Sequence, residues 1–244
     1  LSASCSVLNQ VQERATDALM RRTCRRPLAC GALKPKNGMA IGLLLGSGGL
    51  AILFAATGTA PALLGLVATG WYLLTYAPLK RRSSWAVIAG TPCGALPPMI
   101  GWLAAGGNPL DPQPLTLVLL MVLCQVPHYW LLALPDRDEL RQVGFRVLPE
   151  KLTSHQLINV SHFWILGMVT ATLLLPPMRL VHLPALQWFI AVLAISFVIW
   201  TTRIQTKTLF IEKTAGKLRM GLHIYLGLVL ASILLNGLFL RLNF

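Results

Sequence analysis

Long apolar runs constrain this chain more than any other feature of its sequence. A helix needs about 20 mostly apolar residues to cross the hydrocarbon core of a bilayer. Seven runs meet that length: 38–57, 59–79, 85–105, 114–134, 157–178, 184–203 and 220–240. Backbone polar groups in lipid must bond within their own segment, so such runs form helices. The sequence therefore predicts an all-α, polytopic membrane helix bundle of seven full spans. Residues 1–20 are expected to be the end of an earlier helix.

Composition and charge distribution agree with a membrane protein. The mean hydropathy is +0.64, with 55% apolar and 12% charged residues, which excludes an ordinary soluble domain. A net charge of +13 is also typical of nucleic-acid binding. However, if residues 1–37 lie in the cytoplasm, all but two of the 21 Lys and Arg residues fall on the inner side, the exceptions being Arg179 and Arg241. The positive-inside rule accounts for this pattern without a nucleic-acid partner.

The acidic residues on the inner side carry the functional signal, because the positive-inside rule makes no demand on Asp or Glu. Asn9, Glu13 and Asp17 have i, i+4, i+8 spacing, which places them on one face of a helix. A basic cluster, residues 21–26, follows directly. Stacked carboxylates beside basic residues suit Mg²⁺ that holds a phosphate-bearing substrate. The alternative is a solvated helix end with membrane-anchoring arginines.

A second inner segment is basic. Tyr76 is followed by Lys80 and Arg81 at the inner end of a predicted span. Lysine and arginine there could grip diphosphate oxygens through charge-assisted hydrogen bonds. The alternative is a basic cluster that only marks the end of a span.

A third segment combines a histidine with acids. His128 lies within a predicted span, where an ionisable side chain is costly unless it is paired or faces a cavity. Asp136, Asp138 and Glu139 follow and are close enough in sequence to bind one divalent cation. The alternatives are a hydrogen-bonded structural histidine and a solvated acidic loop.

Together these blocks resemble the UbiA-type intramembrane prenyltransferases. The matching residues are Asn9, Glu13 and Asp17 with M-x-R-T-x-x-R-P-L over 20–28, Y-x-P-L-K-R-R-S over 76–83, G-A-L-P-P-x-I-G-W over 94–102, and P-H-Y over 127–129. The chain is most similar to the protohaem IX farnesyltransferase (haem O synthase) branch. The resemblance covers residues 9–149 in detail and the later spans in character.

The resemblance implies a nine-helix bundle with a cavity open to the cytoplasmic side. Residues 1–244 would then be one integral-membrane domain that lacks the N-terminal helix and most of the second. Two acidic motifs would act in catalysis and hold Mg²⁺ on a prenyl diphosphate: Asn9, Glu13 and Asp17, then Asp138 and Glu139. The diphosphate would be bound by Arg22, Arg26, Tyr76, Lys80 and Arg81. His128 would contact the haem acceptor.

The implied reaction is transfer of a farnesyl group from farnesyl diphosphate to a vinyl group of haem B, which yields haem O for haem-copper oxidases. Two alternatives remain: prenylation of a quinone precursor or other lipid acceptor, and a membrane transporter. The implied location is the bacterial plasma membrane with the site on the cytoplasmic side, or the mitochondrial inner membrane. Implied partners are the bilayer, haem A synthase and oxidase assembly factors.

Four positions depart from the family pattern. Glu13 and Glu139 stand where the family usually has Asp, Leu140 stands where an aromatic residue is usual, and Ala86 occupies a common Asn position. The longer glutamate arms change the geometry available to a metal, and the other two positions bear on the acceptor.

Overall fold

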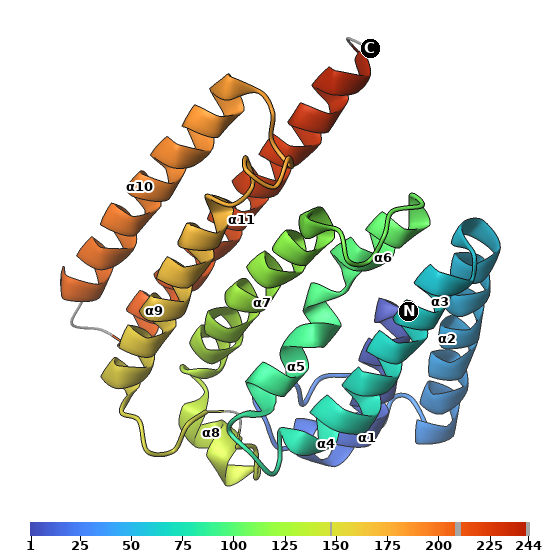
Figure 1. Cartoon of the computed structure of the whole chain (residues 1–244). Helices are drawn as coiled ribbons and strands as arrows, with labels where there is room; N and C mark the ends of the chain where they lie inside the picture. Colours follow the sequence, from blue (N-terminus) through green and yellow to red (C-terminus); the bar gives the residue numbers. More distant parts are fainter. Residues whose placement is uncertain (147, 208–210, 243–244) are drawn as a thin grey trace. The chain divides into compact units, whose positions relative to one another are not determined.

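The computed structural model describes residues 1–146, 148–207 and 211–242, and these form helices and connecting turns with no strand among them (Figure 1). The predicted all-α class is therefore confirmed. The elements are α1 (Ser2–Asp17), α2 (Pro35–Thr57), α3 (Thr59–Gly70), the π-helix η1 (Trp71–Tyr76), α4 (Ala77–Leu79), α5 (Ala86–Ala95), α6 (Pro97–Ala104), α7 (Pro112–Ala133), α8 (Arg137–Gln142), α9 (Ser154–Thr172), α10 (Pro184–Lys207) and α11 (Ile211–Leu242).

Six helical stretches within the described residues are long and apolar enough to cross a membrane, so the chain is an integral multi-pass membrane protein. They are Pro35–Thr57, Thr59–Leu79, Ala86–Ala104, Pro112–Ala133, Pro184–Gln205 and Ile211–Leu242. Large apolar side chains on these helices are widely exposed, such as Leu74 at 78% and Trp188 at 74%. Such exposure suits side chains that face lipid rather than water.

The predicted span over 157–178 corresponds to α9, which begins at Ser154 and ends at Thr172. Its first turns are polar, and Thr153 caps it in a reciprocal capping box with Gln156. This helix is therefore less apolar than the other six. The charge pattern still favours a seventh crossing, because the basic residues between 203 and 219 would otherwise face the outer side.

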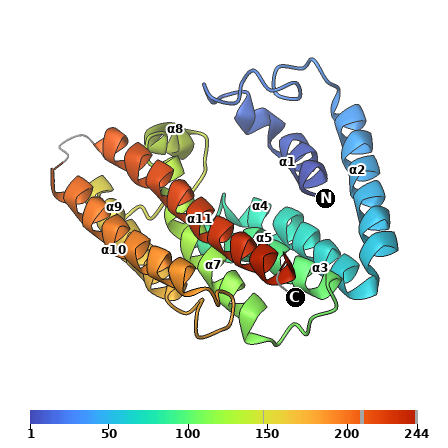
Figure 2. The same cartoon turned by 90° about the horizontal axis from the view of Figure 1, so that it is seen from above.

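The chain forms two compact units, and the first contains Leu1–Pro109 and Asp136–Leu148. Within it α1 packs along α2, and α2 along α3 (Figures 1 and 2). Small residues allow the close approach of α1, because Leu8 packs onto Gly42 and Ser4 Oγ donates a hydrogen bond to the Gly42 carbonyl at 2.7 Å. The packing fixes the face of α1 that carries its acidic residues.

A π-helical turn changes the course of the helix near the end of the next span. The span Thr59–Leu79 contains η1, and Pro78 follows it in α4. Proline cannot donate the helical hydrogen bond, and π-turns are frequent at functional sites. The Tyr76 ring packs on Gly90 of α5, which has no side chain in the way. Tyr76 and Lys80 are thereby held at this end of the first unit.

The predicted span over 85–105 is interrupted, as its glycines and prolines indicate. Helix α5 ends at Ala95 and α6 begins at Pro97, and Pro92 lies inside α5. The break follows from the hydrogen-bond donors that proline lacks.

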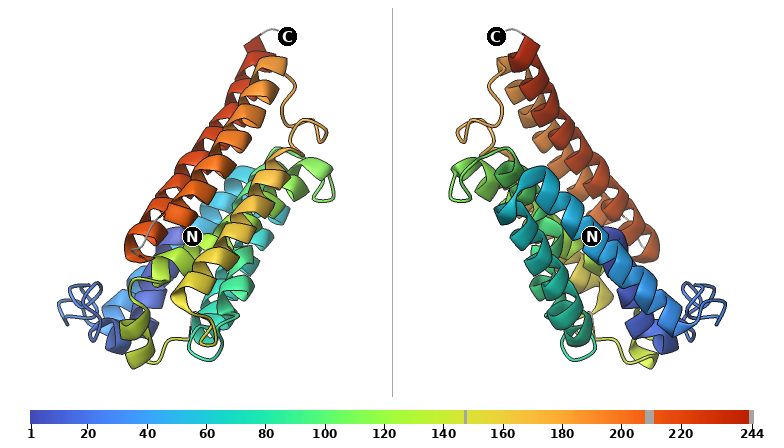
Figure 3. Two further views of the ribbon diagram at one scale, coloured as in Figure 1. Left: turned by 90° about the vertical axis from the view of Figure 1, so that its left-hand side faces the viewer. Right: turned by 90° about the vertical axis from the view of Figure 1, so that its right-hand side faces the viewer.

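The second unit contains Leu110–Pro135 and Pro149–Phe244, and so α7, α9, α10 and α11. Helices α10 and α11 lie side by side (Figure 3). Tyr225 is buried in its core, with its hydroxyl 2.7 Å from Thr172 Oγ1 and its ring stacked on Phe197. Asn236 accepts hydrogen bonds from the backbone N–H groups of His182 and Leu183. The interpretation of residues 1–244 as one domain stays a prediction.

The α1–α2 contact is testable at Gly42. A methyl group there would lie 2.5 Å from Leu8 Cδ2, so Gly42→Ala should destabilise the protein by about 1–3 kcal/mol through overpacking. The apparent thermal midpoint in detergent measures the effect. Gly48→Ala is the matched control on the same helix, because a methyl group there meets nothing within 4 Å. Equal midpoints for the two variants would contradict the packing described.

Candidate functional site

The acidic face of α1 lies buried beside a lysine from a distant part of the chain. Asn9 Nδ2 donates a hydrogen bond to Glu13 Oε2 at 2.8 Å. Lys80 Nζ lies 2.6 Å from Glu13 Oε1 and 3.3 Å from Asn9 Oδ1. The side chains of Lys80 and Glu13 are only 11% and 7% exposed. The structure therefore brings together three of the predicted residues, although Lys80 lies 71 positions from Asn9.

Asp17, the last residue of α1, has an arginine partner. Arg26 Nη1 donates to Asp17 Oδ2 at 2.9 Å, and the buried Thr23 hydroxyl donates to the Asp17 carbonyl at 2.9 Å. The segment after α1 therefore folds back onto the helix end. A carboxylate at a helix C-terminus faces the negative end of the helix dipole and needs a cation nearby. Arg26 supplies that positive charge in this structure.

Aromatic rings flank the cations of this cluster. Lys80 Nζ lies 5.6 Å from the Tyr76 ring centroid and 5.5 Å from that of Phe145. Arg81 also lies over Phe145, at 5.7 Å, and donates to Thr16 Oγ1 at 3.4 Å. These contacts are cation–π interactions, which hold the cations without neutralising them. Tyr76 is thus brought to the lysine as predicted.

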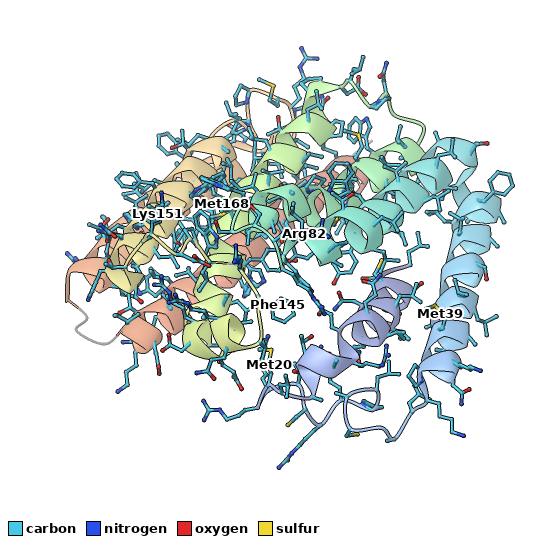
Figure 4. The ribbon with its side chains drawn as sticks, turned by 90° about the horizontal axis from the view of Figure 1, so that it is seen from below. Met20, Met39, Arg82, Phe145, Lys151 and Met168 are labelled. Carbon is cyan, nitrogen blue, oxygen red and sulfur yellow. The ribbon has the colours of Figure 1, made fainter. Side chains whose placement is uncertain are left out.

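Phe145 belongs to the segment after α8, and Figure 4 labels it together with Met20 of the segment after α1. Both side chains are buried. The backbone N–H of Arg146 donates to the Lys80 carbonyl at 2.9 Å, which fastens this segment to the end of α4. Sequence reasoning missed Phe145, because a lone phenylalanine in a loop carries no signal of this contact.

The second acidic segment docks on the loop that follows α1. The backbone N–H of Arg21 donates to Glu139 Oε1 at 2.6 Å, and Arg22 Nε lies 3.7 Å from Asp136 Oδ2. The Arg22 pair is largely exposed, so it contributes little to stability. Asp138 is exposed on α8. The two acidic motifs thus belong to the same unit, joined through residues 18–26.

The donor types suit a hard cation, although their carboxylates are engaged with other groups. Amide and carboxylate oxygens are the ligands that Mg²⁺ prefers. Within the described ranges, no three Asp, Glu, His or Cys residues are grouped tightly enough to bind a metal by themselves. Instead, Lys80 and Arg26 supply the positive charge beside Glu13 and Asp17. The residues fit a metal that arrives with oxygen ligands of its own, such as those of a diphosphate.

His128 lies in the second unit, on α7. Its Nδ1 is 2.8 Å from Nε2 of His223 on α11. From its position in a predicted span, His223 is expected to be a hydrogen-bonded structural residue, and this contact shows that the two histidines form a pair. The remaining predicted site residues belong to the first unit.

The chain belongs to the UbiA prenyltransferase family, whose model matches residues 1–209. It is similar to protohaem IX farnesyltransferases: 41% identical to that of Geobacter sulfurreducens over 79% of this chain and 71% of the relative, and 36% identical to that of Nitratidesulfovibrio vulgaris over 77% and 64%. The chain thus spans about two thirds of the length of these relatives. The family assignment made from the motifs is confirmed, and a prenyltransferase family does not support the transporter alternative.

The fold is also similar to a solved structure. The structure described as giving insights into digeranylgeranylglyceryl phosphate synthase in membranes has a TM-score of 0.72. The match covers 96% of this chain and 80% of that one at 18% sequence identity. This likeness supports the UbiA-like helical fold.

The Lys80–Glu13 pair is testable by a double-mutant cycle. Lys80→Met leaves a buried carboxylate without its cation and should cost about 3–5 kcal/mol. The double variant Glu13→Gln/Lys80→Met removes both charges and should recover part of that loss. Apparent unfolding midpoints in detergent measure Lys80→Met, Glu13→Gln and the double variant, with Lys217→Met on the exposed α11 surface as control. A double variant less stable than Lys80→Met would contradict a buried ion pair.

Proposed function

We propose that the protein transfers a farnesyl group from farnesyl diphosphate to a vinyl group of haem B, the reaction that makes haem O. The observation that carries this proposal is the buried Asn9–Glu13–Lys80 cluster beside the Asp17–Arg26 pair. This part of the first unit therefore holds both carboxylates that could bind a metal and cations that could bind a diphosphate. The names of the relatives support farnesyl diphosphate and haem as the substrates.

In this proposal Glu13 and Asp17, with Asn9, bind Mg²⁺ on the inner leaflet side of the first unit. Asp138 and Glu139 supply a second acidic surface. When bound, Mg²⁺ would neutralise charge that develops on the departing diphosphate. The site lies at the negative end of the α1 dipole, which favours cations, and this supports metal binding there.

The basic residues bind and orient the diphosphate. Lys80 and Arg26 would bind phosphate oxygens in place of their carboxylate partners, which would leave Glu13 and Asp17 to hold the metal. Arg22 and Arg81, which are both exposed, extend the positive surface. These cations stabilise the leaving group as the allylic carbon–oxygen bond breaks. Tyr76 and Phe145 exclude water from one side of Lys80.

The acceptor completes the reaction. The vinyl group of haem B attacks the farnesyl carbon, and water adds to the resulting cation with loss of a proton. His128 contacts the haem. We place the protein in the bacterial plasma membrane with this site on the cytoplasmic side, because the basic residues gather there. Haem A synthase and oxidase assembly factors are the partners that this product would need.

A product assay tests the proposal. Membranes that carry the full-length protein, supplied with farnesyl diphosphate, Mg²⁺ and haem B, should yield the farnesylated, hydrated haem by mass spectrometry. Asp17→Asn and Lys80→Ala should each lower the rate at least a hundredfold, since each removes a charge that acts on the diphosphate. Chelation of Mg²⁺ should abolish turnover. Glu212→Gln, which changes an exposed carboxylate on α11, should leave the rate unchanged.

The outcomes separate the parts of the proposal. Diphosphate release without modified haem would reject haem as the acceptor and leave prenyl transfer to another lipid. A folded protein that neither turns over nor binds farnesyl diphosphate with Mg²⁺ would reject the proposed activity altogether.

A further inference from the structure

Two histidines of the second unit, His128 and His223, form a pair, and the proposed function assigns a role only to His128. His128 Nδ1 and His223 Nε2 are 2.8 Å apart, and the ring centroids are 4.7 Å apart. At that distance one nitrogen carries the proton and the other accepts it. The pair leaves two nitrogens outside its hydrogen bond: Nε2 of His128 and Nδ1 of His223.

The location of the pair indicates a ligand rather than simple packing. Both residues lie in membrane-spanning helices, where ionisable side chains are expensive and usually functional. His223 is exposed and His128 is half-buried, so the pair is open at the surface of its unit. A structural pair that satisfied only itself would be better placed inside the helix packing, where Tyr225 and Leu222 of α11 lie.

The identity of the two outer nitrogens decides which histidine can bind a metal. Nε2 of His128 is the ring nitrogen remote from its own backbone, whereas Nδ1 of His223 lies next to its own main chain. A histidine that binds a metal through one nitrogen usually donates its other N–H to a fixed acceptor, which sets the tautomer. His223 Nε2 lies 2.8 Å from His128 Nδ1 and is such an acceptor in the tautomer that carries the proton on His128 Nδ1.

A cation accompanies the pair. Arg219 precedes His223 by four residues on α11, so the two lie on the same face of that helix. Haem combines an iron atom that takes imidazole nitrogen with propionate groups that take guanidinium groups. An imidazole pair beside an arginine matches both parts.

We propose that His128 Nε2 is the axial ligand of the acceptor haem iron, that His223 is the positioning residue that holds His128 in the ligating tautomer, and that Arg219 binds a propionate. This inference rests on the proposed function for the identity of the acceptor. To that function it adds the nitrogen atom that binds the iron and a positioning role for His223, which acts through His128. The haem is bound as a substrate, so the iron–nitrogen bond forms reversibly and no electron is transferred.

The test is titration of ferric haem b into the full-length protein in lipid nanodiscs, without farnesyl diphosphate. Absorption and electron paramagnetic resonance spectra should show a nitrogen-ligated haem. His128→Ala should lose that signature and bind at least tenfold more weakly, and added imidazole should restore the spectrum. His223→Ala should keep iron ligation but weaken binding by about ten- to a hundredfold. His223→Gln should recover part of that loss, because its amide oxygen accepts the same hydrogen bond.

The control is His155→Ala, which removes an exposed histidine at the start of α9 and should change nothing. Binding of farnesyl diphosphate by each variant verifies that it is folded. An unchanged haem spectrum in His128→Ala would overturn the proposed ligand, even if the wild type makes farnesylated haem. Equal haem affinity in the wild type and His223→Ala would overturn the positioning role. A wild type that binds farnesyl diphosphate and no haem would reject both this site and the proposed acceptor.

Discussion

The buried ion pair between Glu13 and Lys80 is the interaction on which the rest of the site depends. Burial of two charges is expensive, and a well-packed apolar pair would usually serve stability as well or better. Under the proposed function, the pair is a resting arrangement: Lys80 neutralises Glu13 until a metal would bind the carboxylate and a diphosphate would bind the lysine. Arg26 and Asp17 repeat the arrangement one helical turn further along α1. Within the described residues the acids therefore carry counter-ions in place of a preformed metal cage.

The scaffold of the first unit explains how these groups meet. The glycine contacts of α2 let α1 approach closely, and the π-turn before Pro78 sets the position of Lys80. The Arg146 N–H bond to the Lys80 carbonyl then fixes Phe145 over two cations. Apolar side chains cover the outer surfaces because lipid, not water, is the surrounding solvent.

Local patterns in the sequence predicted much of this arrangement. The seven apolar runs predicted the helices, and the i, i+4, i+8 spacing predicted that Asn9, Glu13 and Asp17 share a face, since both depend only on helical geometry. The Lys80–Glu13 pair joins residues that are far apart in the sequence; the family resemblance assigned both residues to one site but did not predict the pair. Phe145 gave no local signal, and the position of His128 within a span indicated that it needs a partner but not that the partner is His223, because tertiary packing alone brings these residues together. The polar first turns of α9 also explain why the helix begins before the apolar run that defined the predicted span.

The most direct measurement is a structure of the full-length protein with Mn²⁺ and a non-hydrolysable farnesyl diphosphate analogue, with the metal located by its anomalous signal. The account predicts metal bound by Glu13 and Asp17, with Lys80 and Arg26 moved from these carboxylates onto the diphosphate. Metal and diphosphate bound elsewhere, with the Lys80–Glu13 and Arg26–Asp17 pairs unchanged, would contradict it.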